Sequence, residues 1–129
     1  MKYERAYNNT CTIHRFRDGD TLECFIRCGC CGAVSHEVIR LPKIDSWELK
    51  SPDRHKAIHA AQNLTATYRG VTGTLALQGR TRDRYRRLIA DVLIDGEALS
   101  IQLVNRGFAW YGVGEPEPQG HKFPDGRLG

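Results

Sequence analysis

The chain begins with short runs in which apolar and polar residues alternate, a pattern typical of strands with one buried face. Within residues 10–23 the alternation is interrupted at Asp18-Gly19-Asp20, a sequence typical of a turn. This stretch therefore predicts two strands joined in a hairpin. A strand continues from Cys24, reverses at the Gly- and Cys-rich tip Gly29-Cys30-Cys31-Gly32, and is expected to return as a third strand toward Leu41.

The pattern changes after Lys50. Ser51-Pro52-Asp53 is typical of a helix start, because Ser or Asp can cap the helix and Pro is tolerated in the first turn. Apolar residues then recur at helical spacing until Gly70; they are Ala57, Ala60, Ala61, Leu64 and Tyr68. Residues 71–78 and 87–94 predict strands, the second followed by an Asp95-Gly96 turn, and residues 99–105 predict a second helix that ends at Gly107.

Short strands with a helix between the third and fourth fit a small closed sheet such as a five-stranded OB-type barrel, although a mixed open sheet satisfies the same pattern. At 129 residues the chain has the length of a single domain. We expect a mainly β domain with helices (α+β) over residues 1–129 and a core over about 10–111. Residues 114–129 are rich in Gly and Pro, so an irregular or mobile tail with little to bury is expected there.

The composition is 40% hydrophobic and 26% charged, which is typical of a globular protein and argues against a disordered or fibrous chain. A formal net charge of +4 is compatible with an anionic partner such as nucleic acid, without establishing one. Residues 1–10 contain no apolar run that would serve as a signal peptide or a membrane span. We therefore expect a cytoplasmic protein with no membrane partner, and secretion of a trimmed form stays open.

Four of the five cysteines crowd into one predicted hairpin; they are Cys24, Cys28, Cys30 and Cys31. A reducing compartment fits them better than a disulfide framework does. They lack the paired C-x-x-C spacing of zinc ribbons, and His36 is the nearby imidazole in this segment, which argues against a Zn²⁺ site at the hairpin. Free thiols are the favoured interpretation, with a disulfide and a metal site as alternatives.

Acidic and basic residues recur in three separated clusters: Asp18-Gly19-Asp20-Thr21, Arg40-Leu41-Pro42-Lys43-Ile44-Asp45-Ser46-Trp47-Glu48 and Asp83-Arg84-Tyr85-Arg86-Arg87. A hard divalent cation prefers carboxylate and carbonyl oxygens, a phosphate prefers guanidinium groups, and an attacking water needs a carboxylate to accept its proton. Together the clusters predict a metal-assisted phosphodiesterase site. Each has a simpler interpretation alone, because an Asp-Gly-Asp turn and an arginine run are usually solvated surface features.

In this order, the clusters resemble the staphylococcal nuclease-like (thermonuclease) family over residues 10–111. The resemblance rests on the Asp-Gly-Asp-Thr turn, Arg40-Leu41 followed by Ile44-Asp45-Ser46-x-Glu48, Thr81-Arg82-Asp83-Arg84-Tyr85-x-Arg87, and Leu103-Val104-Asn105-Arg106-Gly107-Phe108-Ala109. Each motif is weak alone, whereas four in register are specific. The resemblance implies a five-stranded OB barrel with helices packed outside it, cleavage of DNA and RNA, and a Ca²⁺ cofactor, with Mg²⁺ or Mn²⁺ as alternatives.

Carried over residue by residue, the resemblance implies that Asp20 and Asp45 are metal ligands, together with the backbone carbonyl of Ser46, which stands where the family usually has Thr. Arg40 and Arg87 would bind the phosphate, and Glu48 would activate or orient the attacking water. The substrate would be contacted by Tyr85, Arg84, Trp47 and Tyr111.

Two residues depart from the family pattern. Trp47 stands where Pro is common, so it places a large flat ring that would adjust Glu48 or stack on a base. Arg86 stands where Gly is common, which adds positive charge and demands an unusual backbone angle.

The leading hypothesis is a metal-dependent nuclease that cleaves DNA and RNA, preferably single-stranded, with little sequence specificity, through in-line attack of water. A non-catalytic OB-fold module that binds nucleic acid or protein is the alternative, and a redox-sensitive regulator is a third. The enzyme is favoured because a pure binder has no use for metal ligands, a base and two phosphate-binding arginines together. The oligomeric state stays open.

Overall fold

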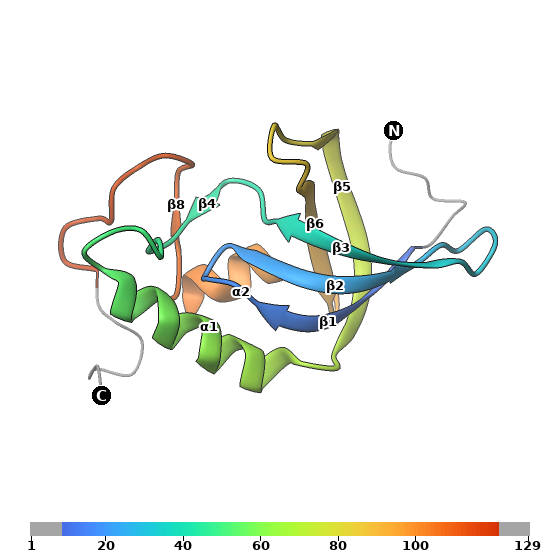
Figure 1. Cartoon of the computed structure of the whole chain (residues 1–129), viewed down its shortest axis with the longest axis horizontal. Coiled ribbons are helices and arrows are strands. Elements are labelled where there is room, and N and C mark those ends of the chain that lie inside the picture. The colour runs from blue at the N-terminus through green and yellow to red at the C-terminus, as the bar shows by residue number, and fades with distance from the viewer. Residues whose placement is uncertain (1–8, 122–129) are drawn as a thin grey trace.

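The chain forms a closed five-stranded β-barrel with helices packed outside it (Figure 1). The computed structural model describes residues 9–121, apart from the side chains of residues 78–81. The barrel strands are β1 (Thr10–Phe16), β2 (Thr21–Arg27), β3 (Val34–Arg40), β5 (Thr72–Arg82) and β6 (Leu88–Ile94). They pair antiparallel in the order β3-β2-β1-β5-β6, and a parallel pairing of β3 with β6 closes the barrel. The expected α+β barrel is confirmed, and the open sheet is excluded.

Both expected helices are present, as α1 (Arg54–Tyr68) and α2 (Leu99–Asn105). α1 lies along β1, where the hydroxyl of Thr65 accepts a 2.8 Å hydrogen bond from the backbone N–H of Phe16. The helix buries the face predicted by its apolar spacing, with Ala57, Ala60, Leu64 and Tyr68 turned to the core. Within residues 9–121, neither helix has the length and apolarity needed to cross a membrane.

The structure adds short strand pairings that the alternation of residues does not predict. β4 (Ile44–Asp45) pairs with β8 (Trp110–Tyr111), and β7 (Glu97–Ala98) pairs with the end of β6. The first pairing sets Asp45 opposite Trp110. It therefore ties the second acidic cluster to the C-terminal part of the chain.

The segment after β8 covers a pair of buried tryptophans. Trp47 is 3% exposed and meets Trp110 edge-on, with ring centroids 5.6 Å apart. Its indole N–H donates a 2.8 Å hydrogen bond to Glu117, and the indole N–H of Trp110 donates to the carbonyl of Glu115. The predicted role of Trp47 in stacking on a base is therefore corrected, because the ring is part of the core.

The same contacts correct the expectation that the C-terminal tail has little to bury. Residues 114–121 form no helix or strand, yet His121 packs on both tryptophan rings, with centroid distances of 5.5 Å to Trp47 and 5.4 Å to Trp110. The rest of the tail, residues 122–129, lies outside the described residues.

Glu23 on β2 is a buried carboxylate held by basic side chains. Only 7% of its side chain is exposed, and Oε2 accepts contacts of 2.7 Å from Arg15 and 2.8 Å from Arg17, while Oε1 lies 3.1 Å from His36. Burial raises the pKa of Glu23, but the hydrogen bonds from Arg17 and Arg15 outweigh it and lower the pKa to about 2. The ionised form therefore stabilises the fold.

This arrangement predicts an acid-dependent loss of stability. Because the folded-state pKa of Glu23 lies below its ordinary value of 4.5, its contribution is present above about pH 4.5 and is lost as the pH falls toward 2. We expect Glu23→Gln to lower the free energy of unfolding at pH 6. The difference between the two proteins should shrink by about 1–2 kcal/mol when the pH falls to 2.5, and it stays this small because the arginine partners are half exposed. Urea unfolding of both proteins across this range measures it. A difference that does not change with pH would contradict the prediction.

Candidate active site

Three turns from different parts of the chain converge on one cleft of about 690 Å³. They are the Asp18–Asp20 turn between β1 and β2, the segment that follows β3 and contains β4, and the turn at residues 83–87 between β5 and β6. The cleft is lined by Arg17, Asp18, Asp20, Thr21, Arg40, Asp45, Glu48, Leu49, Lys50, Tyr85, Arg87, Val113 and Gly114.

The strand register brings these turns together. Thr21 at the start of β2 pairs with Arg40 at the end of β3, and Arg40 pairs in turn with Ile89 on β6. Barrel closure therefore sets the first, second and third sequence clusters side by side. Six of the predicted site residues share the cleft: Asp20, Arg40, Asp45, Glu48, Tyr85 and Arg87.

The Asp18–Asp20 turn is held by its first residue. The Oδ1 atom of Asp18 accepts hydrogen bonds of 3.0 Å from the backbone N–H groups of Asp20 and Thr21. The turn also packs closely on its neighbours, since a Cβ added at Gly19 would lie 2.5 Å from the carbonyl oxygen of Phe108 and 2.7 Å from Cβ of Ser46. Only glycine fits this position without a shift of the backbone.

We expect Gly19→Ala to destabilise the protein by about 1–3 kcal/mol, because backbone rather than a flexible side chain meets the added methyl group. The same shift of the backbone at Gly19 should move the carboxylate of Asp20, so phosphodiester cleavage per folded molecule should fall. The matched control is Gly96→Ala, outside the cleft lining, where a backbone φ of +80° strains an alanine and no atom of the described residues lies within 4 Å of the added Cβ. Thermal unfolding and activity, measured for both, separate the effects. Equal cleavage activity in the two variants would contradict the claim that the packing of Gly19 positions Asp20.

Asp20 and Asp45 form the acidic floor of the cleft, and they are 6% and 9% exposed. Asp20 accepts a 2.8 Å hydrogen bond from the hydroxyl of Thr21. Asp45 accepts hydrogen bonds of 2.9 Å from the backbone N–H of Ser46 on Oδ1 and from that of Gly114 on Oδ2. Both carboxylates are thus fixed in place by neighbouring groups.

Acidic groups are crowded and desolvated at this floor, which favours their neutral forms when no cation is bound. Burial and the neighbouring carboxylate of Asp20 raise the pKa of Asp18 to about 8, and burial together with Asp20 also raises the pKa of Asp45. The hydroxyl oxygen of Ser46, next in the chain to Asp45, is buried without a hydrogen-bond partner among the described residues, and it lies against Gly19. Crowded, desolvated carboxylates are a donor set that fits a hard divalent cation.

Arg40 lies against the two carboxylates without being locked to either. Its Nη2 atom is 3.6 Å from Asp20 and 3.9 Å from Asp45, longer than the 2.7–2.9 Å of a charge-assisted hydrogen bond. Its Nη1 atom donates a 2.6 Å hydrogen bond to the carbonyl of Leu41, and the side chain is 13% exposed. The guanidinium is therefore oriented by the backbone and keeps an edge for an anion.

Arg87 is positioned by Asp83, a residue to which the sequence motifs assign no role. Nε and Nη2 of Arg87 each lie 2.8 Å from Oδ2 of Asp83. The other carboxylate oxygen accepts the backbone N–H groups of Tyr85 and Arg87. Burial raises the pKa of Asp83, but the hydrogen bonds from Arg87 and Tyr85 outweigh it and lower the pKa, so Asp83 is an ionised brace for the turn. In the sequence, this role is indicated only by the position of Asp83 four residues before Arg87, a spacing at which an acid and an arginine can form an ion pair.

Arg86 adopts the backbone angle expected of the glycine that it replaces, with φ of +67°. Tyr85 is 63% exposed and lies beneath two guanidinium groups, 5.0 Å from Arg84 and 5.2 Å from Arg87. Its exposed ring therefore stands at the rim of the cleft, in a cationic environment.

The remaining predicted residues are distributed as follows. Glu48 lines the cleft with an exposed side chain. Ser46 and Trp47 are buried and Arg84 and Tyr111 are exposed, and all four lie outside the cleft lining. The structure thus places Glu48 in the same cleft as Asp20 and Asp45, and it does not place Ser46, Trp47, Arg84 or Tyr111 there.

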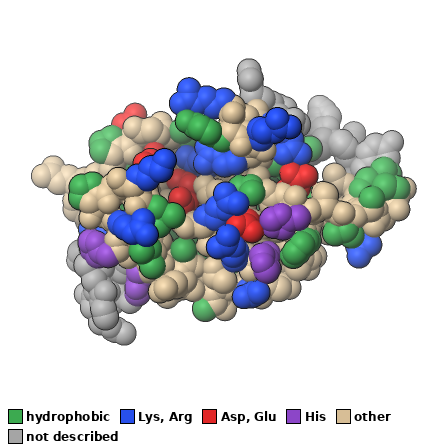
Figure 2. All heavy atoms as spheres, viewed as in Figure 1, with side chains coloured by type: hydrophobic (Ala, Val, Ile, Leu, Met, Phe, Trp, Pro, Cys, Tyr) green, Lys and Arg blue, Asp and Glu red, His purple; other side chains and the backbone are tan. Residues whose placement is uncertain are grey.

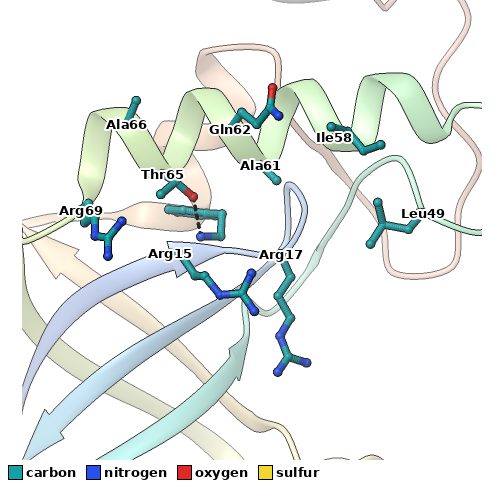
Figure 3. A pocket seen from close by; sticks show the side chains of 10 residues that line it. Arg15, Arg17, Leu49, Ile58, Ala61, Gln62, Thr65, Ala66 and Arg69 are labelled. Atoms are coloured by element: carbon teal, nitrogen blue, oxygen red, sulfur yellow. Dashed lines mark hydrogen bonds between the residues drawn. The ribbon is translucent and has the colours of Figure 1, made fainter.

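A second hollow of about 540 Å³ adjoins the cleft, between β1 and α1 (Figure 3). Arg17 and Leu49 line both hollows, and Arg15 and Arg69 add positive charge to the second one. Figure 2 shows Lys and Arg side chains spread over this face of the molecule, around a few acidic side chains near its middle. The cleft therefore opens onto a basic surface.

Known proteins are similar to this chain over a region that includes most of these cleft residues. A family model described as "Staphylococcal nuclease homologue" matches residues 38–123, which include the second and third clusters. A curated relative named "Uncharacterized endonuclease", from Haemophilus influenzae, is 29% identical over 102 residues, which is 79% of this chain and 52% of the relative. The chain spans about half the length of that curated relative.

Proposed function

The chain belongs to the staphylococcal nuclease family, and from that premise we propose that its cleft hydrolyses phosphodiester bonds of DNA and RNA with little sequence specificity. The observation that carries the proposal is the shared lining of one cleft by buried acids, two arginines and an exposed glutamate; they are Asp20, Asp45, Arg40, Arg87 and Glu48. A module that only bound nucleic acid would have no use for two desolvated carboxylates beside the phosphate-binding groups.

Arg40 and Arg87 bind the scissile phosphate in this proposal. Each guanidinium group is oriented by a hydrogen bond that it donates, from Arg40 to the carbonyl of Leu41 and from Arg87 to the carboxylate of Asp83. Because their positions are fixed before substrate arrives, little reorganisation is needed when negative charge increases on the phosphoryl oxygens.

The residues that would hold a divalent cation are Asp20, Asp45 and the backbone carbonyl of Ser46. Bound there, Ca²⁺ would act as a Lewis acid toward a phosphoryl oxygen, and Mg²⁺ or Mn²⁺ are the alternatives. The crowding of Asp20 and Asp45, which raises the pKa of Asp45, supports this assignment, because a bound cation would favour their ionised forms.

Glu48 accepts the proton of the attacking water. Its side chain is exposed at the cleft, so solvent reaches it directly. The water then attacks phosphorus opposite the leaving oxygen, and the arginines stabilise the charge of the transition state.

A single strand fits this surface better than a duplex does. Its unpaired bases can lie against the exposed ring of Tyr85, and the phosphates beyond the cleft meet the arginines of the adjoining hollow. Contacts of this kind attract the backbone and do not distinguish bases.

The test uses purified protein with labelled single-stranded DNA, RNA and duplex DNA, in Ca²⁺, Mg²⁺, Mn²⁺ or a chelator. We expect internal cuts with a divalent cation, faster on single strands, and none with chelator. Cutting that persists in chelator would contradict the role of the cation. No cutting in any ion, together with salt-sensitive binding of the same strands, would make the protein a binding module.

A further inference from the structure

The β2–β3 hairpin ends in a cluster of three cysteines that the proposed nuclease site does not use. Cys28, Cys30 and Cys31 place their sulfur atoms within 4.8 Å of one another, and Cys30 and Cys31 are exposed. The described residues supply three donors to this group. All five cysteines of the chain are free thiols, and the other two, Cys11 and Cys24, are buried.

The hairpin tip is held in its shape by hydrogen bonds that involve no sulfur. The backbone N–H of Cys28 donates to the carbonyl of Ala33, and that of Gly32 donates back to the carbonyl of Cys28, each at 2.8 Å. Asn9 accepts from the N–H of Gly29, and Arg27 donates to the carbonyl of Gly32. A hydrogen-bonded turn therefore holds the backbone of the three cysteines in one conformation, which keeps their thiols close together.

We propose that Cys28, Cys30 and Cys31 bind one soft, thiol-seeking metal ion in three-coordinate geometry, with Cu(I) as the best match. Three sulfurs around an ion with metal–sulfur bonds of about 2.3 Å lie about 4 Å apart. The sulfurs of Cys28 and Cys30 are 2.7 Å apart and all three lie within 4.8 Å, so these two side chains would separate around a bound ion. Thiolate donors select soft ions, and a structural Zn²⁺ site would need a fourth ligand.

The thiols of the tip must lose their protons when they bind a metal ion. The thiol of Cys30 donates a hydrogen bond to the sulfur of Cys28, which lowers the pKa of Cys28 to about 7 and raises the pKa of Cys30 to about 11. A bound ion would displace the remaining protons, so binding should become stronger as the pH rises.

The site is independent of the cleft. β2 runs from Thr21 at the cleft to Arg27 at the tip, so about 20 Å of strand separates the two (Figure 1). A change in one site should therefore leave the other intact, which gives each proposal a separate control.

The test is a competition for Cu(I) between the reduced protein and bicinchoninate under anaerobic conditions, followed by near-ultraviolet thiolate-to-copper absorption. We expect one Cu(I) per chain for the wild-type protein. The Cys30→Ser, Cys31→Ser double variant keeps Cys11, Cys24 and Cys28 and should lose this binding while unfolding at the same temperature. Asp20→Asn, altered in the cleft, should bind Cu(I) like the wild-type protein.

Equal Cu(I) affinity in the double variant would overturn the site, because the remaining thiols would then account for the binding. A Cys28–Cys30 disulfide that forms in a reducing glutathione buffer, detected by mass spectrometry, would also overturn it, since two of the three donors would be consumed.

Discussion

Replacing Arg40 with Ala should lower the rate of phosphodiester cleavage on the order of 10²–10³-fold, the usual cost of removing one preorganised group that stabilises transition-state charge. Arg40 is the guanidinium nearest the acidic floor, 3.6 Å from Asp20, and its orientation is set by the carbonyl of Leu41. Without Arg40, the phosphate loses one guanidinium partner, and Asp20 and Asp45 lose the positive charge of the guanidinium beside them.

Single-turnover cleavage of a labelled single strand measures this effect. Arg40→Lys keeps the charge but not the planar fork and should recover only part of the rate. The matched control is Arg106→Ala, which removes an arginine that packs on Tyr68 and Phe108 outside the cleft. Thermal unfolding of each variant separates lost chemistry from lost folding. A rate within a few-fold of wild type for Arg40→Ala would refute its role.

Asp20→Asn should abolish the stabilisation of the protein by divalent cations together with cation-dependent cleavage. In the wild-type protein, a cation at about 100 times its Kd adds about 2.7 kcal/mol to the free energy of unfolding, or on the order of 10 °C in Tm for a domain of this size. The amide of Asn keeps the shape and the hydrogen bond from Thr21 but removes the charge that attracts the ion.

Without added cation, the same variant should be at least as stable as the wild-type protein, because one member of a crowded set of buried acids has been neutralised. Asp95→Asn is the control, since Asp95 lies in the turn after β6 at a positive φ that Asn tolerates. Melting curves with Ca²⁺ and with chelator report both effects. An unchanged cation-induced rise in Tm for Asp20→Asn would place the ion elsewhere.

The local elements of this fold were predictable because their signals are local. Alternation over residues 10–23 and the turn sequence at Asp18–Asp20 specify a hairpin, and alanines at helical spacing specify α1. Likewise, Asp95-Gly96 forms a turn with both φ angles positive, as a two-residue hairpin requires. Closure of the barrel was different: β3 and β6 are far apart in sequence, and only the family motifs indicated that they meet.

The candidate site was predictable where function constrains residue type, and less so where packing does. The carboxylates and arginines of the three clusters meet in one cleft as the motifs imply. The place of Trp47 was not predictable, because its burial depends on Trp110, Glu117 and His121 from the distant C-terminal segment. The pairing of β4 with β8 has the same cause, since two-residue strands carry no periodic signal.

The central claim is that this cleft hydrolyses phosphodiesters with Glu48 as the base, and the most direct measurement is single-turnover cleavage of an end-labelled single strand in Ca²⁺ by wild-type protein and by Glu48→Gln. The control variant is Glu37→Gln, which alters an acid of β3 paired with Arg82. We predict cleavage by the wild-type and control proteins, and a loss on the order of 10²–10⁴-fold for Glu48→Gln with unchanged strand binding. Equal cleavage by Glu48→Gln and wild type would contradict the account.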